Sequence, residues 1–261
     1  NAAQLRTRLP WLCASALGLQ TSAGLGDRLG LATVGHIRAI VGSGVAPIFA
    51  QQSVRENTRT HRTPQTVYDD AMWAVFQEGW LLPWGADADH LKTEADILPF
   101  VQSGYTFFTI DPGEHVAAIA DDADMQNLRQ QYDQLPWQDL QLTSAQLLDR
   151  YVGKQFELEV FTLMFTEEEL IKVAVKYAAA VAHAAKMYYA VRAALAGKFF
   201  DFEVSVDETE QPTTIQEHFF IAYELNRLGV QWVSLAPRFV KKKKKGVDYI
   251  GDLPIFEKEL K

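Results

Sequence analysis

Two carboxylates and an imidazole lie close together in the stretch GADADHLK at 85–92, where a predicted strand ends. Alternate residues of a strand point to the same face, so Asp87 and Asp89 would present their carboxylates together, with His90 as the next group along. Such a set suits the binding of a hard cation or the transfer of protons. The structural alternative is that Asp89 caps the helix that begins at TEAD, and both interpretations stay open.

The same chemistry recurs one predicted strand later, in TIDPGEHV at 109–116. Asp111, Glu114 and His115 lie at and after the end of that strand, as Asp89 and His90 lie at the end of the preceding one. Two successive strand ends with Asp and His are harder to dismiss than one. The alternative for His115 is that it begins a helix in the segment that follows.

A third acidic candidate, Glu203, lies inside the apolar run FFDFEVSVD at 199–207. Neighbouring strand residues face opposite sides, so Glu203 points away from the face of Phe202 and Val204, which in a barrel is toward the lumen. An ionised carboxylate there is costly unless a cation or a partner compensates it. We therefore expect Glu203 to be a metal ligand; the alternative is an ion pair with an Arg or Lys across the barrel.

The elements that would position these residues alternate along the chain. Apolar runs whose last residues turn polar predict strands at 45–53, 84–91, 105–112, 199–207 and 230–239, with an earlier strand in part of 12–22. Helices are predicted over 34–42, 63–79 and 166–197. This order predicts an α/β fold with a parallel sheet, either a (β/α)8 barrel of the TIM type or a doubly wound sheet.

The number of units sets a limit on the barrel. About six β/α units can be placed, whereas a closed barrel of this type has eight. We expect one barrel domain over 1–261, incomplete in this chain, with a helical insertion around 117–165.

Composition narrows the classes of partner. The chain has 261 residues and a formal net charge of −8, which disfavours nucleic acid and anionic membranes and favours small-molecule ligands. Cys13 is the only cysteine, so an intrachain disulfide is excluded, and neither a membrane span nor a signal peptide is predicted. These features predict a cytoplasmic protein, and a homo-oligomer stays open.

Two further motifs are better explained by loop structure than by a binding site. GLGDRLG at 24–30 is one residue too long for a dinucleotide fingerprint, and we expect a tight turn that exposes Asp27 and Arg28. The five lysines at 241–245 are typical of a solvated loop.

Several stretches together suggest a family. GLGDRLG, PIFAQQSVREN, VFQEG, GADADHLK, FTIDPGEHV, DFEVSVDETE and GVDYIGDL occur in this order between residues 18 and 260. In this order and spacing the chain resembles the tagaturonate epimerases of bacterial hexuronate catabolism. The resemblance implies a metal-dependent barrel that interconverts tagaturonate and fructuronate, with relatives that act on tagatose and fructose. Members of the family are longer at both ends, and one of their metal-binding segments has no counterpart here.

The resemblance also implies a mechanism. The two sugar acids differ at the carbon β to the ketone, whose hydrogen the carbonyl does not acidify, so a retro-aldol cleavage and re-closure is expected. In that scheme we expect Glu203 to be a ligand of a divalent metal (Zn, Mn, Ni or Co), Asp89 and His90 to be the base or a second ligand beside Asp87, and Asp111 and His115 to have orienting roles.

Four further residues at predicted strand ends are candidates for holding the keto sugar acid: Gln51, Gln52, Arg55 and Arg238. An arginine fork suits the substrate carboxylate, and the amides suit hydroxyl groups. The alternatives are a metal-dependent ketose isomerase or aldolase, and a non-catalytic carbohydrate-binding barrel remnant.

Overall fold

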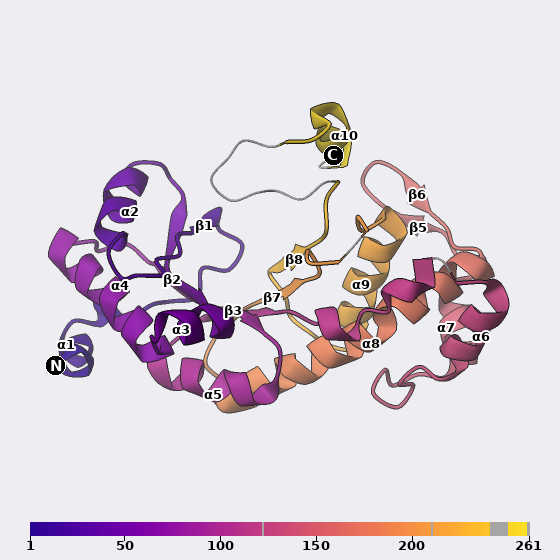
Figure 1. The fold of residues 1–261 in the computed structure, drawn as a ribbon, viewed down its shortest axis with the longest axis horizontal. Coiled ribbons are helices and arrows are strands. Elements are labelled where there is room, and N and C mark those ends of the chain that lie inside the picture. Colours follow the sequence, from indigo (N-terminus) through magenta and orange to yellow (C-terminus); the bar gives the residue numbers. More distant parts are fainter. Residues whose placement is uncertain (122, 210, 241–249, 260–261) are drawn as a thin grey trace. The chain divides into compact units, whose positions relative to one another are not determined.

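The computed structural model describes residues 1–261 except 122, 210, 241–249 and 260–261 (Figure 1). The five lysines at 241–245 therefore lie outside the described residues. The chain divides into two compact units. Unit 1 comprises Asn1–Asp111, Met187–Val204 and Trp232–Ser234, and unit 2 comprises Pro112–Lys186, Ser205–Gln231 and Leu235–Lys261.

A parallel α/β arrangement forms the framework. One sheet of six strands has the order β1-β2-β3-β4-β7-β8, and the register from β1 to β7 is parallel throughout. The strands are β1 (Ser22–Gly24), β2 (Ala46–Ser53), β3 (Gly85–Leu91), β4 (Phe107–Ile110), β7 (Asp201–Ser205) and β8 (Ser234–Ala236). The alternation of strands and helices thus correctly predicted an α/β fold with a parallel sheet of six strands.

Helices connect the strands of unit 1. They are α1 (Ala2–Arg8), α2 (Thr33–Ile40), α3 (Val54–Thr60), α4 (Pro64–Glu78) and α5 (Glu94–Ser103), with a 3₁₀ turn η1 (Pro10–Leu12). The sequence signals for α4 are confirmed, because Thr63 accepts a hydrogen bond from the Thr66 N–H and Gly79 ends the helix at φ 63°. The predicted strand within 12–22 is misplaced, since β1 begins at Ser22.

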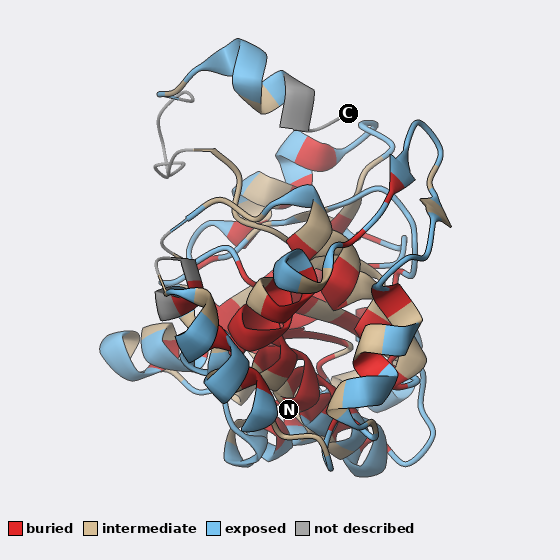
Figure 2. Cartoon of the chain, turned by 90° about the vertical axis from the view of Figure 1, so that its right-hand side faces the viewer, coloured by how far each residue is buried: buried red, intermediate tan, exposed pale blue. Residues whose placement is uncertain are grey.

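Aromatic side chains fill the core of unit 1 between the sheet and its helices. Tyr68 of α4 contacts Trp84 with ring centroids 5.5 Å apart, and Phe100 of α5 meets Tyr105 edge-on at 4.8 Å. On the other face of the sheet, a small cluster of Leu17, Ile48 and Phe107 is buried. Figure 2 shows that the buried residues concentrate in the strands and on the helix faces. This packing holds the strands that carry the candidate residues.

Unit 2 holds most of the predicted insertion as helices and a short hairpin. Its elements are η2 (Gly113–His115), η3 (Ala118–Asp121), α6 (Met125–Asp133), α7 (Ser144–Tyr151), β5 (Phe156–Glu157), β6 (Thr162–Leu163), α9 (Ile215–Arg227) and α10 (Leu253–Glu259). The long helix α8 (Glu167–Ala194), predicted over 166–197, belongs to unit 2 as far as Lys186 and to unit 1 from Met187 onward.

Buried polar pairs order unit 2 internally. Lys176 of α8 donates to Glu217 at 2.8 Å with both side chains almost fully buried, and Tyr151 donates to Glu224 at 2.9 Å. Among the helices of the described residues, none is long and apolar enough to cross a membrane.

Candidate active site

A cavity of about 330 Å³ lies in unit 1 and is bordered by the strands of the sheet. Its lining consists of Gly18, Leu19, Gln20, Ser22, Gly24, Ile48, Gln51, Asp87, Phe107, Glu203, Val233 and Ser234. Two of these are carboxylates, and among the described residues no Lys or Arg lines the cavity. The cavity therefore presents negative charge together with neutral hydrogen-bonding groups.

Asp87 is the most constrained carboxylate of this cavity. It lies on β3 with 2% of its surface exposed, accepts a hydrogen bond from Gln51 Nε2 at 3.0 Å and another from Thr109 Oγ1 at 3.0 Å. Burial raises the pKa of the Asp87 carboxyl well above its usual range, and the neighbouring charges of Asp89 and Glu203 raise it further against the opposing hydrogen bonds. The three acids therefore form one electrostatic cluster.

Glu203 faces the cavity because of strand alternation. Its neighbours Phe202 and Val204 are buried at 0% and 1% exposure, whereas Glu203 is half-buried and lines the cavity. The parallel register pairs it with Thr109 on β4, the residue that donates to Asp87. The orientation predicted from the sequence pattern is confirmed, and it brings Glu203 toward Asp87.

A β-bulge shapes the end of β3. Between Ala88 and Leu91 the register with β4 shifts, and His90 has φ 55°, in the left-handed region that few non-glycine residues adopt. The two adjacent side chains come together there, and His90 Nδ1 lies 2.7 Å from Asp89 Oδ1. Because a carboxylate only accepts, Nδ1 carries the proton in this pair, which makes Nε2 the basic nitrogen of the neutral ring. Asp89 does not cap the next helix, since Thr93 and Asp96 form the capping box of α5.

The remaining predicted residues are placed less centrally. Asp111 is buried at the end of β4 with Lys92 Nζ 3.4 Å from its Oδ2. Arg55 is exposed on α3, and neither it nor Gln52 lines the cavity. His115 and Arg238 belong to unit 2, where His115 stacks on His183 with ring centroids 4.0 Å apart and Arg238 Nη1 donates to the Asp207 carbonyl at 3.1 Å.

The two adjacent glutamines of β2 have different surroundings. Gln51 lines the cavity, whereas Gln52 is 1% exposed, and in the described part of the chain neither polar atom of its side chain has a hydrogen-bond partner. Strand alternation places the two amides on opposite faces of the sheet. Of the two, the structure brings only Gln51 to the acidic cluster.

The carboxylates that the described residues bring to the cavity are ligands of the type that a hard cation prefers, but they are too few to form a complete metal site. Carboxylate oxygens that converge where burial and like charge disfavour ionisation are ligands that divalent cations prefer. In the described part of the chain, however, no group of three or more His, Cys, Asp or Glu side chains could by itself hold a metal ion. Asp87 and Glu203 could therefore supply part of a metal site.

The loop after β1 is ordered by Asp27. Its carboxylate accepts hydrogen bonds from the backbone N–H groups of residues 29–33, the shortest from Ala32 at 2.6 Å, and from the Thr33 hydroxyl. The expectation that Asp27 is exposed is wrong, since it is 8% exposed. Burial by itself would raise its pKa, but these hydrogen bonds outweigh burial and lower it.

Sequence reasoning missed the small residues of the cavity. Ser22 and Gly24 come from β1 and Ser234 from β8, and Thr109 of β4 is linked to the cavity through its hydrogen bond to Asp87. Nothing in their types marks them as functional, and only the register of the sheet brings them to the carboxylates.

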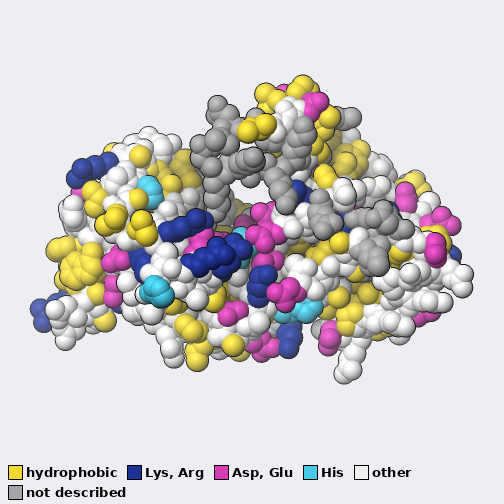
Figure 3. All heavy atoms as spheres, viewed as in Figure 1, with side chains coloured by type: hydrophobic (Ala, Val, Ile, Leu, Met, Phe, Trp, Pro, Cys, Tyr) yellow, Lys and Arg dark blue, Asp and Glu magenta, His cyan; other side chains and the backbone are white. Residues whose placement is uncertain are grey.

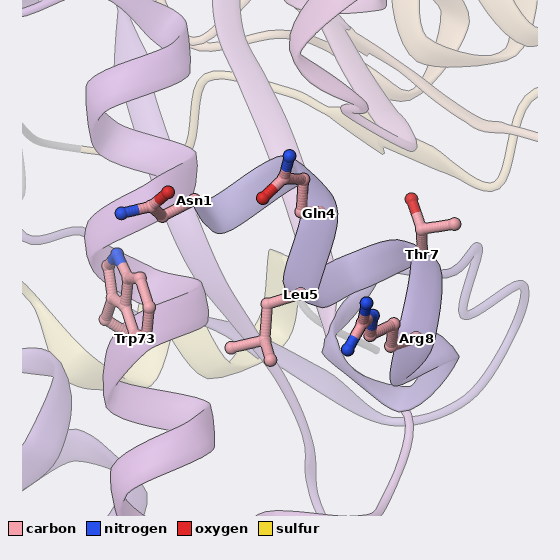
Figure 4. Close-up of a pocket in the computed structure, with 6 residues that line it drawn as sticks. All are labelled: Asn1, Gln4, Leu5, Thr7, Arg8 and Trp73. Atoms are coloured by element: carbon pink, nitrogen blue, oxygen red, sulfur yellow. The ribbon is translucent and has the colours of Figure 1, made fainter.

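A second hollow, of about 560 Å³, lies beside α1 (Figure 4). Asn1, Gln4, Leu5, Thr7, Arg8 and Trp73 line it. It contains no carboxylate or imidazole and none of the predicted site residues. In the view of Figure 3, acidic and basic side chains are interspersed across the visible face. The cavity with Asp87 and Glu203 is thus the better candidate for chemistry.

Comparisons with known proteins agree with the resemblance. The model of a family described as UxaE, tagaturonate epimerase, matches residues 1–261. A protein named tagaturonate/fructuronate epimerase, from Thermotoga maritima, is 43% identical over 262 residues, which is 100% of this chain and 52% of that protein.

Solved structures match equally well. Two crystal structures of the fructuronate-tagaturonate epimerase UxaE from Cohnella laeviribosi, one native and one complexed with one glycerol, are 37% identical with a TM-score of 0.92. Each match covers 100% of this chain and 52% of that one, so the chain spans about half the length of these relatives. The family match over the whole chain and these likenesses show that the chain belongs to the tagaturonate epimerase family.

Proposed function

We propose that this chain is part of an epimerase that interconverts D-tagaturonate and D-fructuronate. The observation that carries the proposal is the 43% identity over 100% of the chain to a protein of that name. The acidic cavity adds a site at which such chemistry could occur.

The proposal includes the architecture. Six strands follow one another in a singly wound order, which is how a (β/α)8 barrel is built. Because the relatives are about twice as long as this chain, we propose that two further strands complete a TIM-type barrel in the whole protein. The cavity would then lie in the lumen.

The reaction determines the work that the residues must do. The inverted carbon is β to the ketone, so its hydrogen is not acidic, and inversion by retro-aldol cleavage avoids removing it. In this route a base takes the proton of the hydroxyl on that carbon, the bond to the α-carbon breaks, and its electron pair passes toward the ketone oxygen as an enediolate. The aldehyde fragment then presents its other face and the bond re-forms.

The Asp89–His90 pair is our candidate for the base. Asp89 orients the imidazole through the 2.7 Å contact to Nδ1, and Nε2 takes the hydroxyl proton and later returns it. The bulge at the end of β3 brings the two side chains together. Gln51 and the serine hydroxyls of the cavity bind the hydroxyl groups of the sugar. Asp111 and His115 stay candidates for orienting roles.

Glu203 and Asp87 would hold a divalent metal ion together with ligands from outside the described residues. When bound, such an ion supplies polarisation of the ketone oxygen and compensates the charge of the acidic cluster. Without it, the two carboxylates repel each other and the substrate carboxylate alike.

The charge of the cavity favours a second candidate substrate class. No Lys or Arg among the described residues lines the cavity, and we place the substrate carboxylate outside it, with Arg55 as the candidate of unit 1 to bind it. A neutral ketose such as tagatose needs no such cation. Comparing kcat/KM for tagaturonate and for tagatose distinguishes the two substrate classes.

The experiment that tests the proposal uses the full-length protein in heavy water. Tagaturonate is incubated under single-turnover conditions and the product is identified by chromatography and NMR, with metal content measured on the same sample. Fructuronate that keeps its hydrogen at the inverted carbon supports the retro-aldol route. Deuterium at that carbon contradicts the route, and absence of fructuronate contradicts the proposed activity.

A further inference from the structure

The side-chain amide of Gln51 is confined on two sides. Its Nε2 donates to Asp87 Oδ2 at 3.0 Å, on the neighbouring strand β3. On its other side lies Gly24, the last residue of β1, which the register pairs with Ile48 of β2. Both Gln51 and Gly24 line the cavity. The position of this amide therefore depends on the space that β1 leaves beside Gly24.

The missing side chain of Gly24 provides the space that the amide occupies. A Cβ atom on Gly24 would lie 2.4 Å from Gln51 Oε1, 2.5 Å from Nε2 and 2.7 Å from Cδ. All three distances are far below a van der Waals contact, and all three atoms belong to the amide that donates to Asp87. An added methyl group would have to displace this amide.

The backbone of Gly24 does not itself require glycine. Gly24 does not have a positive φ, and it pairs with Ile48 of β2 in the regular parallel register. Any L-amino acid could adopt this strand conformation. Space for Gln51, and not conformational freedom, is what sets glycine at this position.

We propose that Gly24 is a positioning residue of the candidate active site, which holds the Gln51 amide against Asp87 and turns Oε1 toward a substrate hydroxyl. The proposal rests on the proposed function for its substrate. Because Asp87 accepts from Nε2, the amide oxygen is the atom left to accept a hydrogen bond from the sugar. Gly24 thereby sets which end of the amide the substrate meets.

The test is a double-mutant cycle in the full-length protein. Gly24→Ala should lower kcat/KM for tagaturonate by about tenfold, the value of one hydrogen bond to a charged group. Gln51→Ala should lower it by a similar factor, and the double variant should be no worse than Gln51→Ala alone, because the methyl group then has no amide to displace. Losses that multiply in the double variant overturn the proposal.

A matched control separates crowding from the loss of a glycine as such. Gly35 lies in α2 at an ordinary backbone conformation, and a Cβ there meets nothing within 4 Å. Gly35→Ala should leave kcat/KM within about twofold of wild type. If Gly24→Ala also stays within that range, the proposal is wrong. If Gly24→Ala fails to fold, the double variant decides: it must fold and match Gln51→Ala.

A structural measurement keeps this inference separate from the proposed activity. In a crystal structure of the Gly24→Ala variant, Gln51 Nε2 should move out of hydrogen-bond distance of Asp87, whereas in Gly35→Ala it should stay. An unmoved amide overturns the positioning role even if the enzyme is an epimerase. A displaced amide in a protein that does not convert tagaturonate supports the positioning and contradicts only the proposed function.

Discussion

Asp27 and Asp87 are both buried carboxylates of unit 1, and their surroundings differ in kind. Asp27 is surrounded by backbone N–H groups and a hydroxyl, which lower its pKa despite burial. Asp87 has two hydrogen bonds and lies near two further carboxylates, and its pKa is raised. The first arrangement stabilises a loop, whereas the second carries an unfavourable charge that a bound cation or a proton relieves. The comparison separates a carboxylate that holds the fold from one that is suited to function.

The largest effect on activity should come from Glu203, the second carboxylate of the cavity beside Asp87. Glu203→Gln keeps the shape of the side chain and removes its charge, so we expect kcat to fall by about 100-fold or more, with lowered metal content and a metal-free unfolding midpoint no lower than that of metal-free wild type. Steady-state kinetics, metal analysis and thermal unfolding on one preparation measure all three. Glu78→Gln, which breaks an exposed ion pair with Arg38, is the control and should change none. Full activity with normal metal content would make Glu203 structural.

Asp27→Ala tests the other half of the comparison. Removing this carboxylate leaves several buried N–H groups without an acceptor, so we expect unfolding to become easier by about 2–3 kcal/mol. Denaturant titration measures the change, with the exposed Asp139→Ala as a control near zero. Because the folded pKa lies below the ordinary 3.8, the stabilisation is present above that pH and is lost as pH falls through the folded pKa. A difference between variant and wild type that does not shrink in acid would contradict this role.

Asp87→Asn should act in the opposite direction on stability. Its folded pKa is raised above 3.8, so the ionised form destabilises the fold at neutral and alkaline pH. We expect the variant to be more stable than metal-free wild type by about 1 kcal/mol at pH 8, and less active. The gain should shrink as pH falls below the raised folded pKa and disappear below 3.8, where the carboxyl is protonated in both the folded and the unfolded wild type. Equal stability of the two proteins across the pH range would show that the cluster carries no strain.

The smallest effect is expected at Gln52, on the same strand as Gln51. Its buried amide has no hydrogen-bond partner among the described residues, so Gln52→Met, of similar volume, should change the free energy of unfolding by less than about 1 kcal/mol. Activity should be unchanged, whereas Gln51→Met should lower it. Equal losses of activity in the two variants would remove the distinction between the faces of β2.

Local patterns were enough to predict β2, β3, β4, β7 and β8, the helices α2, α4 and α8, and the direction of Glu203. The cap of α4 and its terminal glycine are read from Thr63 and Gly79, because both depend on residues a few positions away. The side of β7 that Glu203 occupies follows from alternation with Phe202, and this requires no knowledge of other strands.

Features that depend on strand register could not be predicted. The bulge that brings Asp89 to His90 is a shift between β3 and β4, and no residue type in GADADHLK marks it. Gly24 matters through its distance to Gln51 on another strand. Arg55 and Gln52 are both near the end of β2 in sequence, which made them candidates. Gln52, however, lies on the face of β2 opposite Gln51, and Arg55 already belongs to the following helix α3.

The strand order of the sheet has a consequence for how the site is assembled. β1 to β4 pair with their neighbours in sequence, whereas β7 pairs with β4 only after residues 111–200 have been made. Closing so long a loop is slow compared with the earlier pairings. We expect β2 and β3 to gain amide protection before β7 in pulsed hydrogen exchange during refolding. Glu203 would then arrive after β1 to β4 have paired, so the folding chain would not meet the repulsion between the carboxylates until these four strands are in place.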